Sequence, residues 1–347
     1  MYRDMFALEL RVPIDRMQAH DQLQGETRVL PTLARLEAAA TLVHAVMPPT
    51  PQHCWPLLGQ RAGAEVWVKH ENHTPLGAFK VRGGLLYMQE LKQQQPDVAG
   101  VVAATRGNHG QSVAFAARRA GLVAVIVVPR GNSVEKNAAM RALGGELVEH
   151  GDDFQAAYEY AAGLAAERKL HPVRSFHPAL VAGVGSYGLE LLRAVADIDT
   201  VYVPIGLGSG ICGTMAARDA LGLKTKVVGV VAENAAAYAL SFAKKAPVST
   251  NSADTIADGM ACRVPDKDAL ELIVKGAERI VTVSEDEIKA AMRHYFTDTH
   301  NLAEGAGAAP LAALLQERRR MAGKRVALIL SGGNIDRPLY ASVLNGD

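Results

Sequence analysis

The chain has 347 residues, of which 49% are hydrophobic and 21% are charged, the balance of a soluble globular enzyme with a sizeable core. Its 37 Lys and Arg against 36 Asp and Glu give a formal net charge of +1. This near-neutral balance excludes strong electrostatic attraction to nucleic acid or to an anionic membrane surface. We therefore expect a small-molecule partner, with no nucleic acid and no membrane involved.

Cysteine usage and the N-terminal residues bear on the cell compartment. Cys54, Cys212 and Cys262 are widely spaced and form no C-x-x-C pair, so we expect neither a disulfide framework nor a zinc site. Charged residues interrupt the first twenty positions, which argues against a secretory signal, and the acidic ones argue against a mitochondrial presequence. The longest apolar run, 122–128, is too short to span a bilayer. We expect a cytoplasmic protein.

Residues 1–48 have the character of an N-terminal extension. The stretch from Leu30 to Val46 has a helical pattern, and the proline-rich run 47–51 then forces an extended turn. Residues 1–25 are compatible with a loosely ordered tail. The helix is expected to pack on the body of the chain or on a neighbouring subunit.

Beyond residue 65, short apolar runs alternate with amphipathic stretches, which predicts βα units on a mostly parallel sheet. Several of these runs are apolar and β-branched throughout, as expected of strands covered on both faces. The predicted strands are 65–69, 100–104, 123–128, 146–149, 200–203, 227–231, 279–283 and 326–330. The predicted helices include 108–120, 133–142, 153–167, 210–220 and one that Ser284 and Glu287 open with capping-box spacing.

The first segment that points to chemistry is Thr74–Gly84, which contains Lys80. A lysine amine is a useful Schiff-base nucleophile only when desolvation or a nearby positive charge lowers its pKa. The apolar neighbours Phe79 and Val81, with Arg82 close in sequence, suit that requirement. Taken alone, the segment is equally compatible with a surface lysine at the start of a helix.

The second segment, Thr105-Arg106-Gly107-Asn108-His109, lies after a predicted strand and before a predicted helix. The amides at the start of a helix point outward and can bind an anion such as a carboxylate. An ordinary βα turn with simple capping is the alternative.

The third segment, residues 206–210, also follows a strand and opens a helix, so its amides could cradle a phosphate. Gly208, Gly210 and Gly213 fit the G-x-G-x-x-G pattern, and Glu233 ends the next strand, which leaves a nicotinamide cofactor open from this loop alone. A fourth segment, Ser331-Gly332-Gly333-Asn334, ends a strand where a hydroxyl could face a ring.

Together, and in this order, these segments resemble the threonine/serine dehydratase family of pyridoxal-phosphate (PLP) enzymes, which have the fold-type II, tryptophan-synthase-β-like architecture. The resemblance runs from about residue 50 to the C-terminus. It implies two open, twisted, mostly parallel α/β domains. We expect a large domain formed by residues 1–91 and 181–347, a small mobile domain at 92–180, and the cofactor in the cleft between them.

The resemblance also implies roles for individual residues. Lys80 would form the Schiff base and later move the α-proton, with Phe79 packed on the ring and Asn108 bonded to the phenolic oxygen. The remaining implied cofactor contacts are Gly206, Leu207, Gly208, Ser209 and Gly210 to the phosphate, Ser331 to the pyridine nitrogen, and Gly259 and Glu304 near the ring. The implied substrate-carboxylate site comprises Thr105, Arg106, Gly107, Asn108 and His109.

The chain departs from the family pattern at three places. Related racemases carry a serine where Arg106 stands, and a guanidinium is a poor general base because it stays protonated. The segment after Glu233 supplies no second acid for the divalent cation that some relatives bind, so we expect no metal. Only 13 residues follow Asn334, so we expect no regulatory domain of the kind found in biosynthetic threonine dehydratases.

These features predict a PLP-dependent lyase that converts a β-hydroxy amino acid into a 2-oxo acid and ammonia by α,β-elimination. A serine partner for the ring nitrogen favours elimination, because it makes the ring a weaker electron sink than a carboxylate partner does. Threonine or serine is the default substrate; 3-hydroxyaspartate or phenylserine-like substrates, β-replacement, racemisation and a non-catalytic nucleotide-binding module remain open. A homodimer is what the resemblance suggests.

Overall fold

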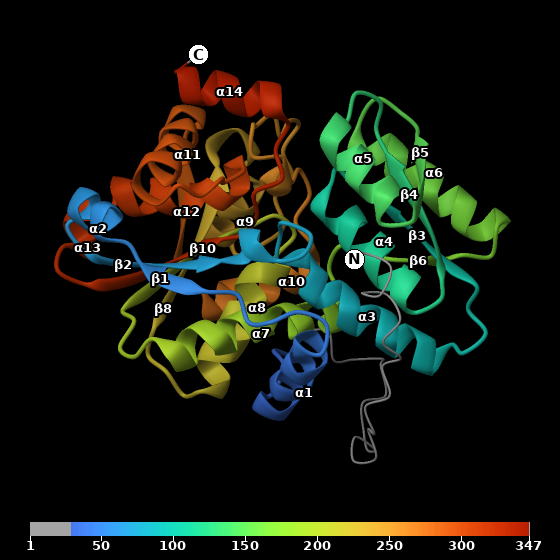
Figure 1. Cartoon of the computed structure of the whole chain (residues 1–347), viewed down its shortest axis with the longest axis horizontal. Coiled ribbons are helices and arrows are strands. Elements are labelled where there is room, and N and C mark those ends of the chain that lie inside the picture. Colours follow the sequence, from blue (N-terminus) through green and yellow to red (C-terminus); the bar gives the residue numbers. More distant parts are fainter. Residues whose placement is uncertain (1–28, 347) are drawn as a thin grey trace.

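The computed structural model describes residues 29–346, which form two open β-sheets covered by helices (Figure 1). The larger sheet has the strand order β1-β2-β10-β7-β8-β9 and the smaller one β5-β4-β3-β6. Every strand pair is parallel except β1 with β2. The predicted α/β class with two mostly parallel sheets is confirmed.

The strands of both sheets are short, and the central ones are apolar on both faces. The larger sheet comprises β1 (Gln52–Cys54), β2 (Glu65–His70), β7 (Thr200–Pro204), β8 (Lys226–Ala232), β9 (Arg279–Val283) and β10 (Arg325–Leu330). The smaller sheet comprises β3 (Gly100–Ala104), β4 (Val123–Val128), β5 (Gly145–Glu149) and β6 (His171–Pro172). Continuous burial along β3 and β10 follows from their helical cover, because parallel crossovers place helices on both sheet faces.

The helices occupy most of the remaining chain. They are α1 (Leu33–His44), α2 (Pro56–Ala62), α3 (Lys80–Gln94), α4 (Asn108–Arg119), α5 (Val134–Ala142), α6 (Phe154–Glu167), α7 (Pro178–Ala194), α8 (Ser209–Ala220), α9 (Ala237–Lys244), α10 (Lys267–Gly276), α11 (Glu285–Thr299), α12 (Gly305–Gln316), α13 (Arg318–Met321) and α14 (Arg337–Asn345). Helix α11 opens with the predicted capping box: the Ser284 hydroxyl accepts from the Glu287 N–H, and the Glu287 carboxylate accepts from the Ser284 N–H.

All eight predicted strands are present, and none of their ends shifts by more than one residue. The sequence analysis missed β1 and β6, which have three and two residues. Runs this short carry no alternation of apolar and polar residues, and β1 is an edge strand whose side chains are largely exposed. Strand β1 also supplies the only antiparallel pair among the described strands.

Helices α3 and α7 lie where the two sheets meet. We call the smaller sheet with α4, α5 and α6 the four-stranded unit, and the remaining elements the six-stranded unit; Figure 1 shows the former on the right. One buried apolar cluster joins Val81 and Leu85 of α3 and Ala182 of α7 to Val101 and Ile126 of the smaller sheet. The proposed domain limits at 91/92 and 180/181 fall inside these helices, and the limits and mobility of the small domain stay predictions.

Helix α1 is part of the predicted N-terminal extension and packs against its own chain. Thr32 caps it, and Leu36, Ala39 and Val43 are buried against α3 and α7. The expectations for residues 1–28 lie outside the described residues. Within 29–346, no helix is both long and apolar enough to cross a membrane.

Candidate active site

A cavity of about 740 Å³ lies between the two units, and every site residue proposed from the sequence lines it. These residues are Phe79, Lys80, Thr105, Arg106, Gly107, Asn108, His109, Gly206, Leu207, Gly208, Ser209, Gly210, Gly259, Glu304 and Ser331. The loops that carry many of them follow β3, β7 and β10. The carboxyl ends of parallel strands are where ligand crevices form in open α/β sheets, because helices begin there.

Lys80 is the first residue of α3 and extends into this cavity. Its Nζ lies 3.2 Å from the Ser209 Oγ and 4.9 Å from the centre of the Phe79 ring. Burial lowers the pKa of Lys80 to about 8. At that pKa roughly one Lys80 amine in ten is neutral at pH 7, against roughly one in three thousand for an ordinary lysine.

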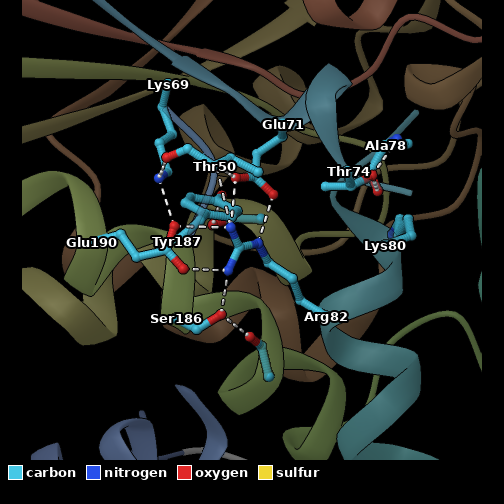
Figure 2. A network of polar contacts seen from close by, with 12 residues as sticks. Thr50, Lys69, Glu71, Thr74, Ala78, Lys80, Arg82, Ser186, Tyr187 and Glu190 are labelled. Carbon is cyan, nitrogen blue, oxygen red and sulfur yellow. Dashed lines mark hydrogen bonds and ion pairs between the residues drawn. The ribbon is translucent and has the colours of Figure 1, made fainter. Parts of the chain in front are cut away.

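The expectation that Arg82 helps to lower the pKa of Lys80 is wrong. Burial alone lowers that pKa, because the charge of Arg82 is already balanced by two carboxylates. Its Nε lies 2.6 Å from Glu71, and its Nη1 lies 2.6 Å from Glu190. Figure 2 shows the guanidinium held between these two side chains, away from Lys80.

The ion network around Arg82 anchors the start of α3. Arg82, Glu71 and Lys69 are fully buried, and Lys69 donates to Glu190 at 2.5 Å. Arg82 also donates to the Ser186 hydroxyl at 2.9 Å, and so ties α3 to α7. The two cations and two carboxylates thus neutralise one another. Because Arg82 follows Lys80 by two residues on α3, its hydrogen bonds to Glu71, Glu190 and Ser186 fix the helix that carries Lys80.

Main-chain hydrogen bonds fasten the segment before Lys80 to the loop after β10. The Phe79 N–H donates to the Ser331 carbonyl at 3.0 Å, and the Gly333 N–H donates to the Gly77 carbonyl at 2.9 Å. Gly77 has φ +65°, and a Cβ there would lie 2.6 Å from the Asn334 Oδ1. The glycine is therefore required for both its conformation and its close neighbour. These bonds place Lys80 and Ser331 on adjacent walls of the cavity.

Residues 206–210 form a loop of backbone amides at the start of α8. Gly208 caps the helix with φ 102°, and no side chain bonds to the first turn. A Cβ at Gly206 would lie 2.3 Å from the Gly259 carbonyl. Phe79 packs edge-on against Tyr187, whose hydroxyl donates to the Gly210 carbonyl at 2.8 Å. The lysine segment and the amide loop are thus packed together.

The turn after β3 is shaped by Thr105. Its hydroxyl oxygen accepts from the N–H groups of Gly107 at 3.0 Å and Gly110 at 3.3 Å. His109 is buried, and burial followed by the charge of Lys80 lowers its pKa to about 3, so the ring is neutral. Its Nε2 has no hydrogen-bond partner among the described residues. A buried polar atom without a partner in a cavity wall is a candidate ligand contact.

Asn108 is held by two residues from distant parts of the chain. Its Nδ2 donates to the Glu304 Oε1 at 2.7 Å, and its Oδ1 accepts from the Asn334 Nδ2 at 2.9 Å. Burial raises the pKa of Glu304 to about 7. Glu304 in turn faces Lys136, a cavity residue that the sequence analysis did not identify. Lys136 stands outside every glycine-rich segment, so no local signal marks it.

Arg106 and Glu233 differ in their relation to the cavity. Arg106 is exposed on the cavity wall, and its side chain makes no ion pair or hydrogen bond with any residue from 29 to 346. Glu233 is exposed on the 3-10 turn η3 (Glu233–Ala235) and does not line the cavity. The described residues contain no cluster of three or more His, Cys, Asp or Glu arranged for a metal ion.

Comparison with known proteins assigns this arrangement to a family. Residues 45–332 match the model of the family described as "Pyridoxal-phosphate dependent enzyme". The chain belongs to the pyridoxal-phosphate-dependent enzyme family. Its cofactor is therefore PLP, and the expected resemblance to threonine dehydratases is confirmed. The nicotinamide alternative for the 206–213 loop is wrong; Gly213 instead allows close helix packing, since a Cβ there would lie 2.9 Å from the Gly185 nitrogen.

Several members of this PLP family are similar over most of the chain. The L-threonine ammonia-lyase of Thermotoga maritima is 35% identical over 290 residues, which are 83% of this chain and 72% of that protein. The structure of a T.th. threonine deaminase is 33% identical, with a TM-score of 0.82 over 88% of this chain and 99% of that one. A PLP-dependent aspartate racemase is 30% identical, with a TM-score of 0.83 over 88% and 96%.

The cavity of this PLP-family chain fits the cofactor that the family implies. The glycine-lined loop at 206–210 lines the cavity at the start of α8, and backbone amides at a helix start can hold a phosphate. Lys80 lies beside that loop, through its contact with Ser209. PLP carries an aldehyde, a phosphate and a phenolic oxygen. The cavity offers one complementary group for each: the Lys80 amine for the aldehyde, the amides of 206–210 for the phosphate and the Asn108 side chain for the phenolic oxygen.

Proposed function

We propose that this PLP enzyme is an ammonia-lyase that converts a β-hydroxy amino acid, by default threonine or serine, into a 2-oxo acid and ammonia. PLP supplies the electron sink that makes the α-proton of the substrate acidic. The observation that carries the proposal is the state of Lys80. Of the two lysines among the described cavity residues, Lys136 faces two carboxylates, whereas Lys80 faces a neutral hydroxyl and has a pKa near 8.

The other residues of the cavity have positioning roles in this proposal. With PLP bound, the amides of 206–210 would hold the phosphate, Phe79 would pack on the ring, and Ser331 would face the ring nitrogen. The turn 105–109 binds the substrate carboxylate through helix-start amides. Gly259 and Glu304 line the same cavity and would lie near the ring. Lys80 would take the α-proton, and this proton would leave with the β-hydroxyl as water.

Racemisation is less well supported than elimination. A racemase must return a proton to the opposite face of the α-carbon, which requires a second base. A guanidinium such as that of Arg106 is a poor general base, and the neutral ring of His109 has a pKa of only about 3. Neither is a suitable partner for Lys80. This contrast favours a lyase, although a racemase is among the similar structures.

A product assay tests the proposal. Purified holoenzyme is incubated with L-threonine, L-serine and a panel of other β-hydroxy amino acids, and 2-oxo acid, ammonia and the D-enantiomer are measured. We expect 2-oxo acid and ammonia in equal amounts with at least one substrate. Formation of the D-enantiomer alone, or turnover that requires a second nucleophilic substrate, would contradict it.

One observation favours an acidic substrate, 3-hydroxyaspartate, as a second candidate. Arg106 presents an exposed guanidinium to the cavity, and none of the described carboxylates pairs with it. A bidentate pair with a substrate β-carboxylate would satisfy it. We expect Arg106→Ser to lower kcat/KM for 3-hydroxyaspartate at least tenfold while that for serine changes less than threefold. Equal effects on both substrates would contradict this assignment.

The cell compartment and assembly are part of the proposal. The three cysteines are free, which supports a reducing compartment, the cytoplasm. A homodimer is proposed on the family resemblance alone, and the chain mass of 36.9 kDa makes it directly testable by light scattering.

A further inference from the structure

A second buried lysine lines the cavity and has no part in the function proposed above. Lys136 begins on α5 in the four-stranded unit and ends between two carboxylates of the six-stranded unit. Its Nζ lies 2.5 Å from the Asp258 Oδ2 and 3.3 Å from the Glu304 Oε2. Only 5% of its side chain is exposed. A cation is thus carried from one unit into the wall of the other.

The path of Lys136 explains why a glycine stands at position 107. A Cβ on Gly107 would lie 2.4 Å from the Lys136 Cδ, closer than two carbon atoms can approach. The lysine stem therefore passes directly over the turn that is proposed to bind the substrate. This crossing brings the ammonium to Glu304.

Glu304 decides which way the Asn108 amide faces. It accepts from the Asn108 Nδ2, while Asn334 donates to the Asn108 Oδ1. Only one orientation of the amide satisfies both bonds, because the oxygen cannot donate and the nitrogen cannot accept. One Nδ2 hydrogen remains unused in these bonds and is available to an acceptor in the cavity.

We propose that Lys136 is a positioning residue of the reaction: it fixes the Glu304 carboxylate against Asn108, and so holds the free Asn108 N–H toward the phenolic oxygen of PLP. This inference rests on the proposed function, in which Asn108 binds that oxygen. Because Lys136 comes from the four-stranded unit, the chain of contacts is complete only when the two units lie as they do here. The arrangement of the units is thereby linked to the geometry at the cofactor.

The charges around Glu304 decide in which direction the loss of Lys136 would shift the pKa of this carboxyl. Lys136 from α5 and Asp258 from η4 (Asp258–Met260) are the charged groups that face it, and Asn108 from α4 and the Gly332 backbone after β10 are neutral. Burial raises the pKa of Glu304 to about 7, and Lys136 opposes this rise. Without Lys136 the carboxyl would stay protonated to higher pH, and a neutral acceptor holds an N–H more weakly than a carboxylate does.

The test compares the holoenzyme with Lys136→Met. The visible absorbance of bound PLP and the value of kcat are both followed as functions of pH. We expect a step near pH 7 in the parent and a step at least one unit higher in the variant. At pH 7, kcat should fall at least about fivefold while KM changes less than threefold, because a one-unit shift lowers the ionised fraction of Glu304 from one half to about one tenth. Lys136→Arg should restore most of both values, since it keeps the positive charge.

Asp336→Asn is the matched control, because Asp336 holds the same helix without touching Glu304. It accepts from the Ser133 hydroxyl at 2.5 Å and from the Val134 and Glu135 N–H groups at 3.2 Å. If Lys136 served only to hold α5 in place, Asp336→Asn would shift the pH step equally. We expect the step to stay near pH 7 in this variant.

Three results would overturn the inference. They are an unchanged pH step in Lys136→Met, an equal shift in Asp336→Asn, and a step that persists in Glu304→Gln, which lacks the titrating carboxyl. The Glu304→Gln experiment also serves if Lys136→Met does not fold. Failure of the parent to take up PLP would instead overturn the proposed function, and this inference with it.

Discussion

Two buried ion networks flank the lysine that we place at the centre of the chemistry, and they differ in how well they are satisfied. Around Arg82, the cations Arg82 and Lys69 match the carboxylates of Glu71 and Glu190, and each carboxylate receives short hydrogen bonds (Figure 2). The second network surrounds Glu304. There one lysine faces two carboxylates, and the Glu304 Oε2 has no hydrogen bond although the Lys136 Nζ lies 3.3 Å away.

The pKa values of the two networks follow this difference. Burial alone would raise the pKa of Glu190, but Arg82 and Lys69 hold it at about 2. Burial raises the pKa of Glu304 to about 7. Lys136 opposes this rise, but it is shared with Asp258, whose negative charge raises the pKa further. Glu190 is therefore ionised across neutral pH, and its network serves the scaffold. The second network lies at its titration point, as expected of groups beside a reacting centre.

We call the network of Arg82, Lys69, Glu71 and Glu190 the scaffold network, and we expect replacement of Arg82 to cause its largest loss of stability. Arg82→Met leaves Glu71 and Glu190 buried with too little positive charge, which costs about 3–5 kcal/mol of unfolding free energy. Chemical denaturation at pH 7 measures this loss. An exposed pair provides the control: Arg168→Met, which breaks the contact with Glu146, should cost no more than about 1 kcal/mol. Equal losses in the two variants would erase the distinction between the networks.

Replacing Glu304 should change stability less and in the opposite direction. A carboxyl whose folded pKa is raised to about 7 contributes stability that is fully present below its ordinary pKa and is lost as the pH rises through 7. Glu304→Gln should therefore be at least as stable as the parent at pH 8, while Glu71→Gln is less stable. Thermal unfolding of the two variants at pH 5 and pH 8 checks the prediction. A strongly destabilised Glu304→Gln would show that its network is also structural.

The smallest effect on stability is expected at His44, which contacts the scaffold network from its solvent-exposed side. His44 on α1 contacts the Glu190 Oε1 at 2.7 Å, but a third of its side chain is exposed. Solvent screening limits such a contact to about 0–1 kcal/mol. His44→Ala should therefore shift the denaturation midpoint only slightly and leave kcat unchanged. A loss of unfolding free energy as large as that of Arg82→Met would mean that the exposed His44 contact contributes as much as the buried Arg82 contacts.

Much of the fold and most of the candidate cavity could be predicted from the sequence. Apolar strand runs and glycine-rich segments are local signals, and they located β3, β7 and β10 with the loops that follow them. Networks between distant residues carry no such signal. Glu71 and Glu190 lie far apart in sequence, so the balanced charge of Arg82 was invisible and its predicted effect on Lys80 was wrong.

The contacts of Lys136 illustrate the same limit. It stands in the first turn of α5, where an exposed lysine is ordinary, and its partners Asp258 and Glu304 come from the other unit. The one sequence feature linked to these contacts is Gly107, which leaves room for the Lys136 stem where it passes from α5 to the other unit. In the structure, this glycine provides the space that the lysine stem occupies.

Covalent trapping of the cofactor tests the central claim most directly. The holoenzyme is reduced with borohydride and digested, and the peptide that carries the pyridoxyl group is identified by mass spectrometry. The account predicts a single modified residue, Lys80, and no label in a folded Lys80→Ala variant, whose kcat should fall by a factor of about a thousand or more. Label on Lys136, or undiminished labelling and turnover in Lys80→Ala, would contradict it.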